Sequence, residues 1–193
     1  LEYVNTTFRQ ITDGFIKENL GMLHKAEDTM RRKRDELKNC RRKEMVGFRR
    51  IDPEVAMEKN TWFHLGRNSC EEILYCLRRI ADPCEEHVDN NFVPLSKEQV
   101  KEYIPLRDTV LFLLRRTEKI LQTDSYDEVD EVRREAEELK DCLEKAREAQ
   151  MQRMQSSKEN ITVAYLYLNL LQETRELTSS LRHLTGRGTL VYY

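Results

Sequence analysis

The stretch that decides the fold reads ILYCLRRIADPC and covers residues 73–84. Its apolar residues recur at intervals of three and four, at Ile73, Leu77, Ile80 and Cys84. This spacing places them on one face of an α-helix, whereas a half-buried strand would alternate apolar and polar residues. Glycine (6) and proline (4) are scarce and 35% of the residues are charged, which favours long helices with solvated outer faces. We therefore expect an all-α protein.

The same spacing extends along the rest of the chain and predicts a bundle of about five or six long antiparallel helices. The expected helices cover residues 3–48, 53–90, 97–121, 127–155 and 159–184. The continuously apolar run 110–114 predicts that the third of these helices is the most buried. Trp62 and Phe63 are expected to anchor the interior, and the tail 186–193, with its two glycines, is expected to be irregular.

Glycine, proline and capping residues mark the helix ends. Gly21 predicts a bend within the first helix, and Pro83 predicts a kink or a break near the end of the second. Asp52 is expected to cap the second helix. Ser96 and Gln99, three residues apart, resemble a capping box at the start of the third helix.

The bulk composition excludes several classes of protein. The net charge of −2 provides no global attraction to nucleic acid, and no run of 18 apolar residues is present that would cross a membrane. The five cysteines form no CxxC pair and make an odd count, so we expect free thiols and neither a disulfide framework nor a zinc cluster. Because the chain starts without an initiator Met or a signal segment, we expect it to be a piece of a longer protein.

Charge is unevenly distributed. Residues 25–50 contain eleven Lys or Arg and five Asp or Glu, a local net charge of +6, whereas residues 124–148 have the reverse, −6. Three interpretations remain open: the two segments pack side by side, both are simply solvated faces, or the basic segment lies near anionic lipid head groups. The candidate residues for contact with a partner or a membrane are Arg31, Arg32, Arg34, Arg41 and Arg42.

A weak internal repeat carries a resemblance to a known family. Residues 73–82 align with residues 170–179, so that Leu74, Arg78 and Ile80 correspond to Leu171, Arg175 and Leu177. The runs LRRIAD (77–82) and VAYLYLNLLQET (163–174), with LRHL at 181–184, resemble the PhoU-like helical domain. They are most similar to the C-terminal cytoplasmic domain of bacterial sodium/phosphate cotransporters. The resemblance implies a tandem helical repeat, with one unit over residues 1–95 and the second over 96–193.

The resemblance also bears on metal binding. Members of the family place an acid four residues before an aspartate in each repeat, and these acids can hold metal clusters. Here Arg78 precedes Asp82 in the first repeat, and Arg175 precedes Ser179 in the second. Because arginine repels cations, we expect that site to be lost, and no cofactor is expected. Weak metal candidates remain in one acidic patch, at Asp82, Glu85, Glu86 and Asp89, which a solvated helix face also explains.

Three functions are considered, and the resemblance implies the first two of them. The first is a regulatory domain of a sodium-dependent phosphate transporter at the cytoplasmic face of the membrane, with the upstream transmembrane region of the same chain as its partner. The second is a free-standing PhoU-type adaptor of phosphate signalling. The third is a helical-bundle metalloprotein, against which the absence of paired Glu-x-x-His elements argues. We expect no enzyme activity and no nucleic-acid partner, with homodimerisation as a further mode of assembly.

Overall fold

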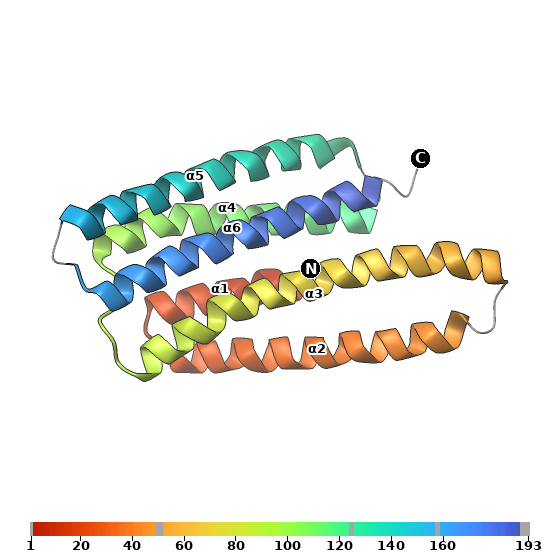
Figure 1. Ribbon diagram of the computed structural model, residues 1–193, viewed down its shortest axis with the longest axis horizontal. Helices are drawn as coiled ribbons and strands as arrows, with labels where there is room; N and C mark the ends of the chain where they lie inside the picture. Colours follow the sequence, from red (N-terminus) through yellow and green to blue (C-terminus); the bar gives the residue numbers. More distant parts are fainter. Residues whose placement is uncertain (1, 49–51, 124–125, 157–158, 190–193) are drawn as a thin grey trace.

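The computed structural model describes residues 2–48, 52–123, 126–156 and 159–189, without the side chains of 58–60, 62–63, 126, 183 and 185–189. These ranges contain six α-helices, one 3-10 helix and no strand, which confirms the predicted all-α bundle (Figure 1). The helices are α1 (Glu2–Ile16), α2 (Leu20–Phe48), α3 (Pro53–Asp89), α4 (Lys97–Thr123), α5 (Val129–Ser156) and α6 (Ile161–Thr189), with the 3-10 helix η1 (Tyr126–Glu128) before α5.

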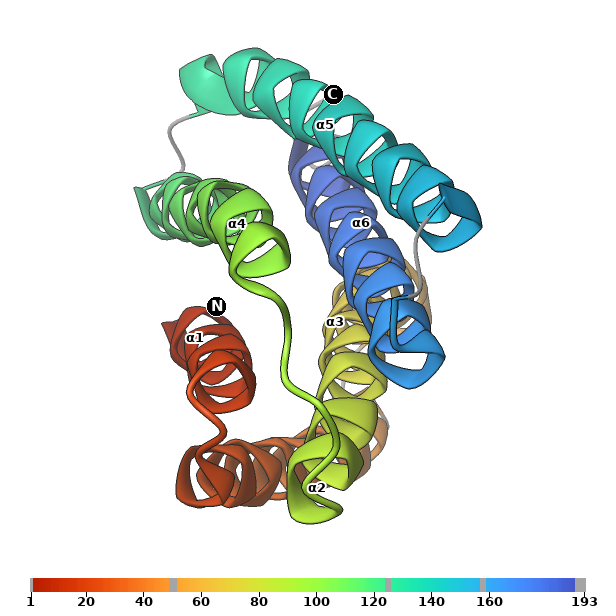
Figure 2. The same ribbon diagram turned by 90° about the vertical axis from the view of Figure 1, so that its left-hand side faces the viewer.

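The helices are arranged in two groups of three, α1–α3 and α4–α6. Within each group, every helix contacts the other two. Between the groups, α1 packs on α4 and α3 packs on α6, while α2 and α5 lie at opposite ends of the assembly (Figure 2). The loop at residues 90–96 joins the groups, close to the predicted boundary at residues 95 and 96. Whether the groups are two copies of one ancestral unit stays a prediction from the sequence.

The core follows the apolar stripes. In α3, the stripe residues Ile73, Leu77, Ile80 and Cys84 are all buried, as their spacing predicts. The run 110–114 in α4 is less uniform, because Phe112 is exposed and lies under the guanidinium group of Arg116. The side chains of Trp62 and Phe63 lie outside the described residues.

The predicted single helix over residues 3–48 is wrong. The chain leaves α1 at Ile16 and starts α2 at Leu20, with Glu18 in the left-handed region at φ 51°. The Asn19 side chain caps the new helix by accepting a hydrogen bond from the Met22 amide at 3.1 Å. Gly21 therefore lies in the first turn of α2 and bends no helix. The reversal allows α1 to pack against α2, α3 and α4.

Other helix ends agree more closely with the local signals. The Asp52 side chain accepts a hydrogen bond from the Glu54 amide at 2.9 Å. Ser96 and Gln99 exchange the two bonds of a capping box, at 2.9 and 3.1 Å. α3 continues through Pro83 without a break. The predicted irregular tail is wrong in part, because α6 continues to Thr189, and residues 190–193 lie outside the described residues.

Candidate partner-binding groove

A groove of about 280 Å³ lies on the surface between α2 and α3. Its lining residues are Met30, Arg34, Leu37, Lys38, Glu71, Leu74, Tyr75 and Arg78. A smaller hollow of about 80 Å³ continues from it along Met30, Arg34 and Arg78 and adds Glu27, Arg31 and Asp82. We call the two together the α2–α3 groove.

The apolar pattern of α2 explains why this space is not filled. Its buried side chains are Leu23, Ala26 and Met30, and after Met30 the next apolar residue that faces α3 is the partly buried Leu37. Polar and charged residues occupy the intervening positions. With so few inward apolar side chains, α2 leaves part of its contact with α3 unfilled, because burying charged groups without partners is unfavourable. The groove therefore has an apolar floor and charged walls.

Four basic side chains (Arg31, Arg34, Lys38 and Arg78) and three acidic ones (Glu27, Glu71 and Asp82) line the groove. Several of the basic side chains are compensated along their own helix: Arg31 pairs with Asp28, Arg78 with Asp82 at 3.4 Å, and Lys38 with Asp35 at 3.8 Å. Arg34 makes no ion pair with any of the residues that the structure describes. The lining has one more basic than acidic side chain, so the groove suits a ligand that places a negative charge beside Arg34.

Tyr75 adds an aromatic wall to the α2–α3 groove. Its side chain is 61% exposed although it lies between the buried Leu74 and Cys76. The guanidinium carbon of Arg79 lies 5.5 Å from the centre of the tyrosine ring, close enough for a cation–π contact. An exposed, well-placed tyrosine beside arginine is typical of residues that contribute most to protein–protein binding.

The structure separates the five arginines that the charge pattern singled out. Arg31 and Arg34 line the groove. Arg32 is exposed and donates to the Thr29 hydroxyl at 3.4 Å, outside the groove lining. Arg41 and Arg42 are exposed further along α2. Thus two of the five share one site, and the other three belong to different parts of the helix surface.

The structure overturns one interpretation of the charges. α2, with the basic segment, and α5, with most of the acidic segment, lie on opposite sides of the bundle (Figures 1 and 2). The acids of α5 are instead paired with closer helices: Arg116 of α4 contacts Glu131 and Glu135, and Arg182 of α6 contacts Glu137. The basic segment of α2 therefore packs on α3 and lies away from the acidic helix α5.

The acidic patch at the end of α3 is divided among several partners. Asp82 pairs with Arg78, and Glu85 pairs with His24 of α2 at 3.2 Å. Partial burial, followed by repulsion from Glu27, raises the pKa of Glu85, while His24 opposes this change. The backbone carbonyls of Glu86 and Asp89 accept bonds from the loop after the helix. No group of three His, Cys, Asp or Glu suited to a metal ion occurs among the described residues.

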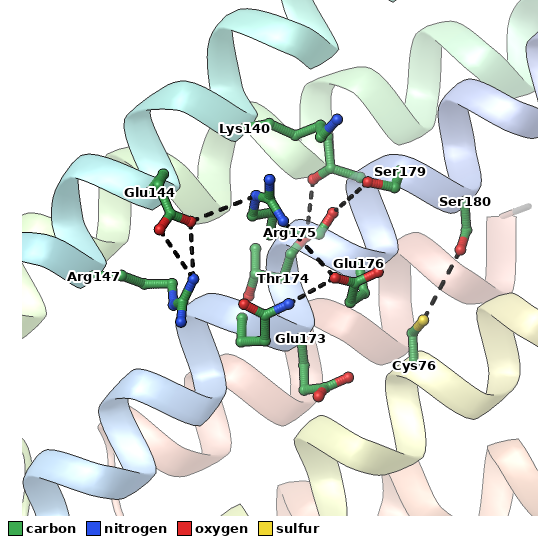
Figure 3. Close-up of polar contacts among 12 residues, drawn as sticks. Cys76, Lys140, Glu144, Arg147, Glu173, Thr174, Arg175, Glu176, Ser179 and Ser180 are labelled. Atoms are coloured by element: carbon green, nitrogen blue, oxygen red, sulfur yellow. Dashed lines mark hydrogen bonds and ion pairs between the residues drawn. The ribbon is translucent and has the colours of Figure 1, made fainter.

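Arg175, which the internal repeat aligns with Arg78, has different surroundings. Arg175 lies between α6 and α5, where its Nε atom is 3.7 Å from a Glu144 carboxylate oxygen (Figure 3). Arg147 pairs with the same carboxylate at 2.8 Å, and Glu176 lies 4.0 Å from Arg175. Acids of α5 and α6 thus occupy the surroundings of Arg175. Arg78, in contrast, lines the open groove, and its ion pair within the described part of the chain is with Asp82 of its own helix.

An ion pair with one buried partner lies behind the groove, between α3 and α6. Arg79, which stacks near Tyr75, also contacts Glu173, whose side chain is fully buried. Burial raises the pKa of Glu173, and the positive charge of Arg79 lowers it in part. Cys76 and Ser180 meet beside this pair at 4.0 Å (Figure 3). Tyr75 and Arg79 therefore connect the groove to the contact between the two halves.

Sequence reasoning missed the apolar and aromatic part of the groove. Leu37, Leu74 and Tyr75 were not recognised as binding residues, although Tyr75 lies three residues before Arg78 and so shares its helix face. A search for apolar residues on the same face as Arg34 and Arg78 would have found Tyr75. The open space itself depends on how α2 and α3 pack, which a local pattern does not contain.

Comparison with known proteins identifies no relative. No protein-family model, curated protein or solved structure matches this chain. Among the described residues, none of the helices is both long enough and apolar enough to cross a bilayer. The groove between α2 and α3 is therefore the feature from which a function is inferred.

Proposed function

We propose that this chain is a regulatory interaction domain that acts by docking and performs no reaction. The α2–α3 groove is the docking site, and the observation that carries the proposal is its composition. An apolar floor, an exposed tyrosine and an arginine with no ion pair to a described residue lie together on one open surface. Such a combination suits an amphipathic segment with apolar anchors and at least one acidic group.

The resemblance to PhoU-like domains supports a specific partner. We propose that the domain regulates a sodium-dependent phosphate transporter and docks on its transmembrane transport region at the cytoplasmic face of the membrane. Because Arg79 contacts both Tyr75 and the buried Glu173, a segment bound at Tyr75 would act on the contact between α3 and α6. Docking in the groove would in this way affect the packing between the α1–α3 and α4–α6 groups.

Charge reversal in the full-length transporter tests this proposal. Arg34→Glu, alone and with Arg31→Glu, places acids in the groove and is expected to change sodium-dependent phosphate uptake several-fold, since like charges at a docking site disfavour binding. Tyr75→Ala, which leaves the charge unchanged, is expected to act in the same direction. Circular dichroism of the domain is expected to stay helical, because all three side chains lie on the surface.

Arg32→Glu is the matched control. It makes the same change of charge on the same helix, outside the groove lining, and is expected to leave uptake unchanged. Equal effects of Arg32→Glu and Arg34→Glu would indicate a general effect of charge and not a groove. Normal uptake in Arg31→Glu/Arg34→Glu and in Tyr75→Ala would contradict the proposed function.

Two alternatives predict different outcomes. A free-standing adaptor of phosphate signalling would use the same groove on a separate protein, and the complete reading frame distinguishes it: a long apolar region upstream selects the transporter. A metalloprotein would contain stoichiometric iron or zinc by elemental analysis of the purified chain. We favour docking over metal chemistry because the groove residues have the character of a protein-binding surface. We favour the transporter over the free-standing adaptor because the resemblance is closest to the transporter's cytoplasmic domain.

A further inference from the structure

The free end of the α2–α3 hairpin is a second surface that the groove does not include. The last buried residue of α2 is Met30, and the first in α3, among its described side chains, is Ser69. Beyond these residues the two helices pack on each other and extend past the rest of the bundle (Figure 1). We call residues 41–48 and 53–57 the hairpin tip.

Apolar side chains at the hairpin tip face outward. Met45 is 59% exposed and Met57 is 76% exposed, and Val46 and Val55 are also exposed. Met45 and Met57 border a shallow hollow with Phe48, Pro53 and Ala56. A cluster of this kind has a free-energy cost in water, so it indicates contact with something apolar.

Basic side chains alternate with these apolar ones on α2. Arg41 precedes Met45 by four residues and Arg42 precedes Val46 by four, so each pair shares a helix face. Arg41, Arg42 and Lys43 are exposed. The acids nearby are engaged at least in part: Glu44 pairs with Arg67 at 2.7 Å and Asp52 caps α3, which leaves Glu54 exposed. The outward face of the tip is therefore both apolar and cationic.

We propose that the hairpin tip inserts into the interface of an anionic lipid membrane. The two methionines and two valines would enter the boundary between head groups and acyl chains, while Arg41, Arg42 and Lys43 would lie at the level of the lipid phosphates. The tip protrudes from the bundle, which suits insertion into a membrane interface better than the binding of a helical segment, because such segments bind in grooves. The acidic helix α5 lies on the opposite side of the bundle from α2, away from the anionic surface (Figure 2).

This inference goes beyond the proposed function and uses different residues. The groove concerns a partner protein, whereas the tip concerns lipid. Either surface can fail without the other, and Tyr75→Ala separates them: this variant is expected to alter transport and to leave lipid binding unchanged.

Vesicle co-sedimentation of the purified chain tests the proposal. The chain is expected to bind vesicles of equal parts phosphatidylcholine and phosphatidylglycerol, and not vesicles of phosphatidylcholine alone. Binding is expected to fall as salt is added, since salt screens exposed charges. Arg41→Glu/Arg42→Glu is expected to lower the partition coefficient at least about tenfold, because each basic residue near an anionic surface contributes about a fivefold factor. Met45→Ser/Met57→Ser is expected to lower it by about the same factor.

Arg134→Glu/Lys145→Glu on α5 is the charge-matched control, because it lowers the net charge of the chain by the same amount as Arg41→Glu/Arg42→Glu but on the acidic helix. This variant is expected to leave vesicle binding unchanged. Circular dichroism monitors folding, which these exposed substitutions are expected to preserve. Three results would each overturn the proposal: no binding to anionic vesicles at low salt, equal loss in the tip and control variants, or a methionine variant that binds as the wild type does. Sedimentation velocity tests whether the tip instead binds a second copy of the chain. If the wild type does not bind vesicles and forms a dimer that dissociates in Met45→Ser/Met57→Ser, the tip is a dimer interface and the proposal is wrong.

Discussion

Arg79 of α3 forms an ion pair with Glu173 of α6, across the contact between the two halves of the molecule. The two partners differ in exposure, because the Glu173 side chain is fully buried and that of Arg79 is 49% exposed. Glu173 Oε2 accepts no hydrogen bond from any of the described groups. Arg79 is therefore the principal compensation for a buried carboxylate, and it also stacks on the tyrosine that borders the groove.

Removing the cation is expected to destabilise the protein. Arg79→Ala leaves the Glu173 carboxylate buried with little compensation, and we expect a loss of about 1–3 kcal/mol in the free energy of unfolding. The loss should lie below that for a fully buried pair because Arg79 reaches solvent. Urea unfolding followed by circular dichroism measures the change. Arg78→Ala is the control: its pair with Asp82 is exposed on both sides, so its loss should stay below about 1 kcal/mol. Equal losses in the two variants would contradict this assignment.

The same carboxylate predicts a dependence of stability on pH. Burial raises the pKa of Glu173 in the folded state, so the folded protein binds the proton more tightly than the unfolded chain does. The contribution of this proton to stability is complete below the unfolded glutamate pKa of about 4.3. It is lost as pH rises through the higher folded pKa. Glu173→Gln removes this term, so its stability relative to the wild type should increase with pH between the unfolded and the folded pKa of Glu173, by at most about 1.4 kcal/mol per pH unit, and stay constant above the folded pKa.

Urea unfolding of both proteins across this pH range measures the difference directly. Taking the difference removes the contributions of the other titrating groups that the two proteins share. A stability difference between Glu173→Gln and the wild type that stays constant with pH would show that the Glu173 pKa is not raised in the folded state.

Local signals predicted much of the fold. The intervals of three and four between apolar residues identified the buried face of α3 from Ile73 to Cys84. Capping pairs located the starts of α3 and α4, because these hydrogen bonds join residues two or three positions apart. Such contacts depend on neighbours in the sequence and hence can be read from it.

Contacts between distant residues were less predictable. The reversal between α1 and α2 requires a positive φ at Glu18, a residue with no special preference for that conformation. The net charge of the basic segment directed attention to Arg31 and Arg34, yet the groove that they line depends on how the side chains of α2 and α3 meet after Met30. Arg78 and Arg175 have different ion-pair partners, which likewise depend on the acids that the neighbouring helix places beside them.

The turn between α1 and α2 also provides a test of which glycine the reversal needs. A Cβ atom at Gly14 would lie 3.0 Å from Leu23 Cγ and 3.2 Å from the Asn19 carbonyl oxygen. Because that oxygen belongs to the backbone of the turn, relief requires α1 and α2 to separate. Gly14→Ala is therefore expected to lower the free energy of unfolding by about 1–3 kcal/mol, although alanine is the better helix former.

Gly21→Ala is the matched variant, seven residues later. There the added Cβ would meet Asn19 Oδ1 at 3.3 Å, the end of a side chain that can shift by a few tenths of an ångström. The gain in helix propensity opposes the strain on this cap, so we expect a stability within about 0.5 kcal/mol of the wild type. Urea midpoints of the two variants, measured side by side, test the comparison. A larger loss in Gly21→Ala than in Gly14→Ala would mean that the chain bends at Gly21, as the glycine in the sequence had indicated, and that the close approach of Gly14 to Leu23 does not hold the two helices together.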